Sequence, residues 1–184
     1  MEQRLRRTSV ITTIVVASGI AFSLGFAAES SQELVVKYVL ETVKAFRTAY
    51  SKGIVEQAKR AGIKTSENWK DDDHAIMLNA QFVKAVGAEI KDFELGLIGL
   101  TPIYQSNLPK TQVEVDALKK MVANPEIKEL IFEDGNRLKG IAADYAISQS
   151  CVDCHNSHPK SPKKDFRQGD LMGAIVVRLN KGHD

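Results

Sequence analysis

The run Cys151-Val152-Asp153-Cys154-His155 constrains this chain more than any other feature, because the fold must accommodate what the run binds. C-x-x-C-H is the attachment signature of a c-type haem: each thiol forms a thioether with a haem vinyl group, and the imidazole that follows binds the iron. The chain has two cysteines, and both lie in this run. We therefore expect one covalent haem c, with thioethers from Cys151 and Cys154 and with His155 as the proximal iron ligand.

Three other interpretations of these residues stay open. A C-x-x-C pair can be a thioredoxin-like redox site, but that motif begins a helix in a βαβ unit, which the surrounding sequence does not predict. Cys151, Cys154, His155 and His158 could bind zinc, although all four would come from one short loop. A disulfide between the two cysteines would leave His155 without a role.

The N-terminus carries an export signal, which agrees with haem c because that group is attached outside the cytoplasm. Arginines near the start precede an uncharged run from Val10 to Ala28. The run is about long enough to span a bilayer core, and the arginines place its N-terminus in the cytoplasm. Gly25 and Ala27 also fit a signal-peptidase site. Residues 1–28 are thus predicted to be a signal anchor or, as the alternative, a cleaved signal peptide.

The remaining residues, 29–184, are the length of one domain that can bury its own core. With a signal anchor, this domain lies on the periplasmic side of the cytoplasmic membrane; after cleavage it would be soluble in the periplasm. The net charge is only +2, so we expect no nucleic-acid partner. We divide the domain into a long helix over 31–59 and a core over 60–180.

Apolar periodicity predicts three helices. The first, from Ser31 to Lys59, is capped by Ser30 or Ser31, and one apolar stripe marks its buried face: Val36, Val39, Val43, Phe46, Tyr50 and Ile54. The same stripe can pair with a second copy, so we expect a parallel homodimer through residues such as Val36, Val43 and Phe46. A second helix is predicted over Leu78–Asp92 and a third over Thr111–Val122.

Four strands are predicted in the second half of the chain. Phe93–Leu100 is a short apolar run between turn signals, and Leu171–Leu179 is rich in β-branched residues. Between them, Ile127–Glu133 and Arg137–Ile147 flank Asp134-Gly135, which suits a type I′ hairpin turn. The haem motif would then lie in a loop between the last two strands, unlike its position among the helices of an ordinary soluble cytochrome c.

The motif with its surroundings resembles the Tll0287-like haem-binding domain family. The resemblance rests on Cys151 to Pro159, Ser161-Pro162-Lys163, Gly169-Asp170 and Gly173, with a weaker likeness over Ala75–Val83, and covers roughly Val35 to Leu179. It implies an α+β, PAS-like fold in which helices flank an antiparallel sheet and a long N-terminal helix precedes it. The family also includes the extracytoplasmic sensor regions of some adenylate cyclases and histidine kinases.

The sixth iron ligand is less constrained. Some members of this family use a cysteine on the first long helix, but the best-matching position here is near Gln57, where no cysteine is available. The ligand must then be His, Met, Lys, a weaker group, water or nothing. His74 is the first distal candidate and Met77 the second. His158 lies on the proximal side, where it would bond to a haem propionate or to backbone, or remain exposed.

Two functions fit these features. The first is a membrane-anchored, extracytoplasmic monohaem c-type cytochrome that transfers single electrons between redox partner proteins. The alternative is a haem-based redox or gas sensor that signals through a separate membrane partner; a zinc-binding structural domain ranks third. A peroxidase-like enzyme would need a distal acid–base pair, which the sequence does not identify, so we do not expect an enzyme.

Overall fold

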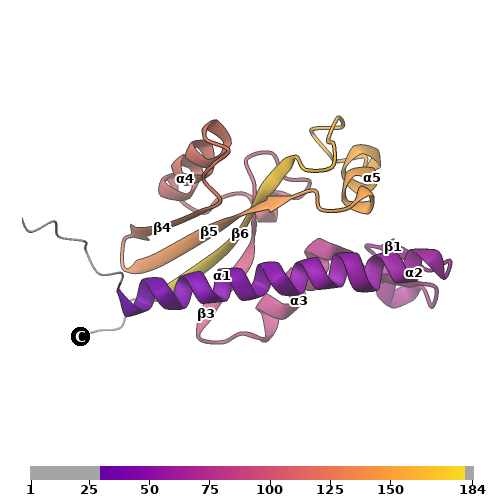
Figure 1. Ribbon diagram of the computed structural model, residues 1–184, viewed down its shortest axis with the longest axis horizontal. Helices are drawn as coiled ribbons and strands as arrows, with labels where there is room; N and C mark the ends of the chain where they lie inside the picture. The colour runs from indigo at the N-terminus through magenta and orange to yellow at the C-terminus, as the bar shows by residue number, and fades with distance from the viewer. Residues whose placement is uncertain (1–29, 181–184) are drawn as a thin grey trace, which may run out of the picture.

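The computed structural model describes residues 30–180. Its centre is an antiparallel sheet in the order β3-β6-β5-β4, formed by β3 (Phe93–Ile98), β4 (Glu129–Asp134), β5 (Arg137–Tyr145) and β6 (Leu171–Asn180). Helices α1 and α3 lie on one side of the sheet and α4 on the other (Figure 1). This is the α+β, PAS-like arrangement that the sequence predicts, with strands at the four expected places.

The first helix runs without a break from Ser31 to Arg60, as predicted. It comprises α1 (Ser31–Ala49), a π-helical segment (Tyr50–Val55) and α2 (Glu56–Arg60). Ser30 caps its start, because the Ser30 side chain accepts from the backbone of Glu33 and the Glu33 side chain accepts from the backbone of Ser30. The π-helical segment holds an extra residue per turn, a feature common at functional sites.

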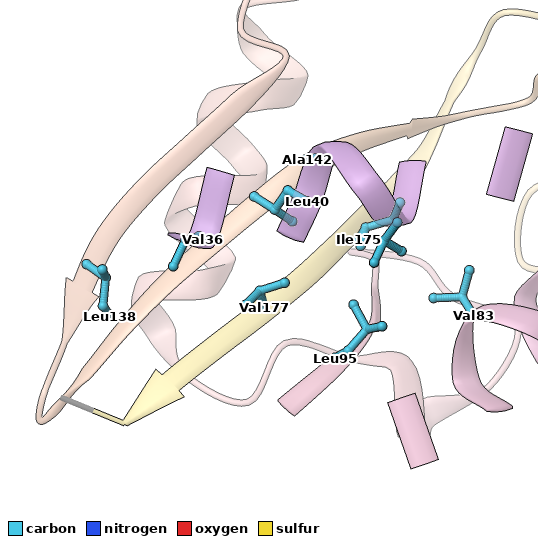
Figure 2. Close-up of a cluster of buried hydrophobic side chains, with 9 residues drawn as sticks. Val36, Leu40, Val83, Leu95, Leu138, Ala142, Ile175 and Val177 are labelled. Carbon is cyan, nitrogen blue, oxygen red and sulfur yellow. The ribbon is translucent and has the colours of Figure 1, made fainter. Parts of the chain in front are cut away.

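A core cluster fills the space between α1, α3 and the sheet. Val36 and Leu40 of α1 are fully buried, and they meet strand residues that alternate along β6, such as Ile175 and Val177 (Figure 2). Gly140 of β5 lies directly under them: a Cβ there would collide with Val36 Cγ1 and come within 2.9 Å of Leu40 Cδ1. Glycine therefore lets the long helix approach the sheet closely.

The predicted apolar stripe of the first helix is only partly right. Val36 and Val43 are buried, but Phe46 and Ile54 are 57% and 55% exposed, and the buried face continues through Leu40 instead. Because Val36 and Val43 are 0% and 8% exposed within one chain, they cannot form the predicted seam with a second copy. The sequence contains two adjacent apolar faces on this helix, and periodicity alone does not tell which one meets the sheet.

The opposite face of the sheet is covered by α4 (Gln112–Ala123), whose start is capped by Thr111. Leu118 and Met121 pack on alternate sheet residues there. Glu114 is fully buried between α4 and the sheet, and accepts from Lys139 Nζ at 2.8 Å and Arg178 Nε at 2.6 Å. Burial alone would raise the pKa of Glu114, but the hydrogen bonds from Arg178 and Lys139 outweigh it and lower this pKa to about 2.

The remaining elements extend or correct the prediction. The second helix is α3 (Asn79–Glu89), as expected, but two short parallel strands precede it, β1 (Lys64–Ser66) and β2 (Ala75–Met77), where we predicted a polar connection. Two 3-10 turns occupy Trp69–Asp71 and Gln105–Asn107. In the β4–β5 hairpin, Gly135 has φ 61° and Asn136 has negative φ, so the turn has the type II′ pattern and the predicted type I′ is wrong.

The haem motif lies in a helix, α5 (Gln149–Ser157), and the predicted loop is wrong. This segment is polar and lacks the repeated apolar positions that indicate a helix in a sequence. Within residues 30–180, no helix is long and apolar enough to cross a membrane. The predicted signal segment, 1–28, lies outside the described residues.

Candidate cofactor site

Helix α5 brings the three motif side chains to one side. Residues three and four apart lie on the same face of an α-helix, so Cys151 is a neighbour of both Cys154 and His155. Both cysteines are free thiols. Burial raises the pKa of Cys154, with smaller contributions from the neighbouring Glu67 and Cys151. The thiols are thus unpaired and available for a bond to another group.

All three side chains line one cavity of about 360 Å³. The first long helix contributes Arg47 and Val55, and the start of α3 contributes its first turn. The end of β3 with the loop after it and the edge of β5 and β6 contribute Leu97, Ile98, Gly99, Pro102, Ile103, Tyr104, Asp144, Met172, Gly173 and Ala174. The wall also includes Thr65, Glu67, Lys84, Ser106, Asn107 and Ser150. The volume and mostly apolar wall of the cavity are typical of a cofactor site.

Hydrogen bonds hold Cys151 from two directions. Ser148, at the N-cap of α5, lies 3.2 Å from Ser51 Oγ of the π-helical segment and 3.3 Å from Cys151 Sγ. Asn79 Nδ2 donates to Ser51 Oγ at 3.3 Å and to Cys151 Sγ at 3.5 Å. The π-helical segment, α3 and α5 therefore meet at this sulfur, which fixes the motif helix relative to the cavity.

His155 has the environment of a neutral imidazole. Burial lowers its pKa, and the neighbouring His158 and the guanidinium of Arg47 lower it further. Its ring makes an edge contact with the buried ring of Phe166, with 5.5 Å between centroids. A neutral, oriented imidazole is the form that binds a haem iron.

Arg47 and Asp144 form an ion pair in the cavity wall. Arg47 Nη2 lies 2.9 Å from Asp144 Oδ1, and both side chains are mostly buried. Burial raises the pKa of Asp144, while the guanidinium of Arg47 partly counters that effect. Arg47 Nε and Asn79 Oδ1 are buried without a hydrogen-bond partner within the described residues.

His158 is the C-cap residue of α5, and its side chain has different neighbours from that of His155. Its Nδ1 accepts from the backbone N–H of Lys160 at 3.1 Å, and its Nε2 lies 3.3 Å from Glu67 Oε1 and 3.4 Å from the hydroxyl of Tyr104. The Tyr104 hydroxyl donates to Glu67 at 2.6 Å, and this bond raises the pKa of Tyr104 to about 12. The backbone bond is one of the roles expected for His158.

The two distal candidates lie away from the cavity wall. The His74 side chain is exposed, and its backbone N–H donates to Asp72 Oδ1 at 2.9 Å. Met77 is half-buried, and its carbonyl accepts from the Tyr50 hydroxyl at 2.7 Å. Neither residue is among the described residues that line the cavity, and Gln57 is likewise exposed and absent from them.

Sequence reasoning missed several residues of the wall. Met172 lines the cavity and packs near Cys151 and Val152, and its thioether is a group that can bind haem iron. Arg47 had a detectable signal, because it is a charged residue four positions after the apolar Val43 on the buried face. Asn79 and Asp144 carried no local signal, and only long-range packing brings them to the cavity wall.

The alternative interpretations of the motif find less support. Within residues 30–180, no three His, Cys, Asp or Glu side chains are placed to hold a metal ion, Cys151, Cys154, His155 and His158 included. Strands β5 and β6, which flank α5, pair antiparallel, unlike the parallel strands of a thioredoxin-like βαβ unit. The two cysteines are not joined in a disulfide.

Comparison with known proteins identifies the family. Among solved structures, the crystal structure of the cyanobacterial heme-protein Tll0287 matches with a TM-score of 0.56 and 16% identity, covering 84% of this chain and 99% of that chain. At this identity the match shows a shared fold. No curated protein sequence matches. A model of the Tll0287-like family matches residues 27–180, and the chain therefore belongs to that family.

Proposed function

We propose that this chain is an extracytoplasmic c-type haem protein that transfers single electrons. The observation that carries the proposal is that both free thiols and the imidazole of the C-x-x-C-H run line one cavity of about 360 Å³. Family membership and the fold shared with a heme-protein support it. In this proposal Cys151 and Cys154 form the thioethers, and His155 is the proximal ligand of a single haem.

The surrounding residues suit that role. A bound haem c supplies a centre that gains or loses one electron. Phe166 fixes the plane of the His155 ring, while Ser148 and Asn79 hold the sulfur of Cys151. Apolar wall residues, among them Val55 and Ile103, limit water near the cofactor. In this proposal these contacts restrain the groups that hold the cofactor, which would keep reorganisation small during electron transfer.

The proposal includes the place where the protein works. Residues 1–28 would export the chain and hold it at the cytoplasmic membrane, with residues 29–184 on the periplasmic side. The partners would be redox proteins of that compartment. The sequence features that support this are the N-terminal arginines and the uncharged run from Val10 to Ala28.

A second candidate function is ligand sensing. It is favoured by the position of His74 and Met77, which do not line the cavity, and by the unpartnered polar atoms that do. An iron without a strong sixth ligand can bind a small molecule, and a PAS-like domain can report such binding to a separate membrane partner.

Absorption spectra of the purified, haem-loaded protein in both oxidation states distinguish these functions. A low-spin iron that does not bind carbon monoxide, and that becomes high-spin in Met172→Leu, is the result expected for electron transfer with a His155/Met172 ligand pair. A ferrous iron that binds carbon monoxide readily supports sensing instead. If the chain takes up no haem when it is produced with a haem c maturation system, both candidates fail.

A further inference from the structure

A second cavity, of about 550 Å³, adjoins the haem cavity. It follows β3, the edge strand of the sheet, and all six residues of β3 line it. Five wall residues are common to the two cavities: Lys84, Leu97, Ile98, Ser106 and Asn107. Lys84 Nζ donates to Asn107 Oδ1 at 3.2 Å, which links α3 to the 3-10 turn after β3. This shared wall therefore lies between the second cavity and a cofactor bound in the haem cavity.

The second cavity has an excess of positive charge, and we call it the cationic groove. Two carboxylates, Asp92 and Glu94, line it against five cationic side chains: Lys84, Lys91, Lys110, Arg137 and Arg178. Glu94 accepts from Lys110 Nζ at 2.6 Å and also from Arg137, so two of the cations share one carboxylate. These hydrogen bonds from Lys110 and Arg137 lower the pKa of Glu94 to about 2, so Glu94 is already ionised at neutral pH. The groove therefore keeps a positive field there even with both carboxylates charged.

The positive charge of the groove faces solvent. Lys84, Lys91 and Lys110 are exposed, and the hydrogen bond from Lys84 goes to a neutral amide. Leu108 lines the same groove and is 43% exposed. Exposed cations beside exposed apolar surface suit an acidic protein, because opposite charges steer the encounter and apolar contact follows. A small-molecule site would instead enclose its ligand within a mostly apolar wall.

We propose that the cationic groove is the docking surface for an acidic redox protein, which exchanges one electron with the haem across the shared wall. The proposal rests on the electron transfer proposed above and names the surface and the charge of the partner. Ferrous haem gives up one electron and becomes ferric, and the oxidised one-electron centre of the partner is reduced. No bond forms or breaks. A partner in the groove lies next to the cofactor because five wall residues belong to both cavities.

Two small oxidants of opposite charge test this surface: ferricyanide, an anion, and the tris(phenanthroline) complex of cobalt(III), a cation. Each takes one electron from the ferrous haem of the full-length, haem-loaded protein in stopped-flow measurements at low ionic strength. Lys84→Glu combined with Lys91→Glu reverses two exposed charges of the groove. Because steering by charge changes association rates by about 10–1000-fold, the rate with ferricyanide should fall at least about tenfold. The rate with the cobalt complex should rise, whereas a change in reduction potential alone would move both rates in the same direction.

The matched control is Lys119→Glu. Lys119 is exposed on α4 and is not among the described residues that line either cavity. This variant should leave both rates within about twofold of wild type, since a distant exposed charge is largely screened. Lys91→Glu alone keeps the test valid if the change at Lys84 disturbs the haem, because Lys91 lines the groove and not the haem cavity. It should slow ferricyanide and speed the cobalt complex, and raising the salt concentration should remove both differences.

A third variant tests the other basic segment near the motif. Lys164 is exposed in the loop after α5, and Lys164→Glu should slow ferricyanide less than Lys91→Glu does. Equal ferricyanide rates in wild type and the groove variants, or a larger loss in Lys164→Glu, overturns the proposal. Covalent haem that still gives an electron to both oxidants in that case leaves the proposed electron transfer intact. A chain without covalent haem would remove the basis of both proposals.

Discussion

Gly140→Ala should destabilise the protein by loosening the contact between the first helix and the sheet. The new Cβ would collide with Val36 Cγ1 and lie 2.9 Å from Leu40 Cδ1. Both side chains are 0% exposed, so neither can turn out into solvent to relieve the contact. Overpacking of this kind costs about 1–3 kcal/mol, and two buried contacts at once place Gly140→Ala near about 2–3 kcal/mol. For a chain of this size, that corresponds to a fall of about 4–12 °C in melting temperature.

Urea unfolding of the haem-loaded protein, followed by far-UV circular dichroism, measures this change. Gly96→Ala is the matched control, because Gly96 lies in β3 of the same sheet and its added Cβ would meet Val176 Cγ1 at an ordinary 3.9 Å. The control should unfold at or above the wild-type midpoint, since alanine is favoured over glycine in a strand. If Gly140→Ala unfolds at the wild-type midpoint with the same m value, the close packing of α1 on β5 is refuted.

Three further predictions follow from single contacts. The pKa of Glu114 is lowered from 4.5 to about 2, so this carboxylate contributes stability above pH 4.5 that is lost as the pH falls towards 2. Thermal unfolding from pH 6 to 2 should show this loss, and Glu114→Gln should remove much of the pH dependence. Glu94→Gln, at a carboxylate 39% exposed, should change the pH dependence less. His155→Ala should abolish normal haem incorporation or give high-spin iron, and His74→Ala should leave the ferric spectrum unchanged, because the His74 side chain does not line the cavity; a change to high-spin iron in His74→Ala would show that this residue reaches the iron. We also expect a homodimer in which the uncharged segments before α1 enter one membrane and the two α1 helices pair through their exposed apolar residues, Val35, Tyr38 and Phe46. The variant Phe46→Cys should cross-link the two chains, and the variant Glu41→Cys should not. A monomer in detergent would contradict the pairing.

The parts of the fold that could be predicted from sequence are those with a strong local signal. Periodic apolar residues and the Ser30 cap place the first helix, and β-branched alternation places β6. The three-residue strands β1 and β2 could not be found in this way, because so short a pair forms only through contacts within the folded chain. The helix that carries the motif was missed because its nine residues have no apolar stripe.

The candidate site likewise contains some residues that the sequence reveals and others that only the folded structure brings together. Cys151, Cys154 and His155 are recognisable because their spacing is set by covalent and coordination chemistry. The opposite wall of the cavity is not, since Arg47, Asn79 and Met172 come from three separate elements and meet only through tertiary packing. The choice of His74 as distal ligand followed residue type along the sequence, and the structure places that side chain at the surface.

Covalent attachment of haem to the motif is the central claim, and mass spectrometry of the denatured protein tests it most directly. The chain is produced with a haem c maturation system, extracted with acidified acetone and digested. We predict that one haem stays on the peptide that contains Cys151 and Cys154, that Cys151→Ala and Cys154→Ala each lose one thioether, and that the double variant retains no haem after extraction. A wild-type peptide with two unmodified cysteines, and haem recovered in the acetone, would contradict the account.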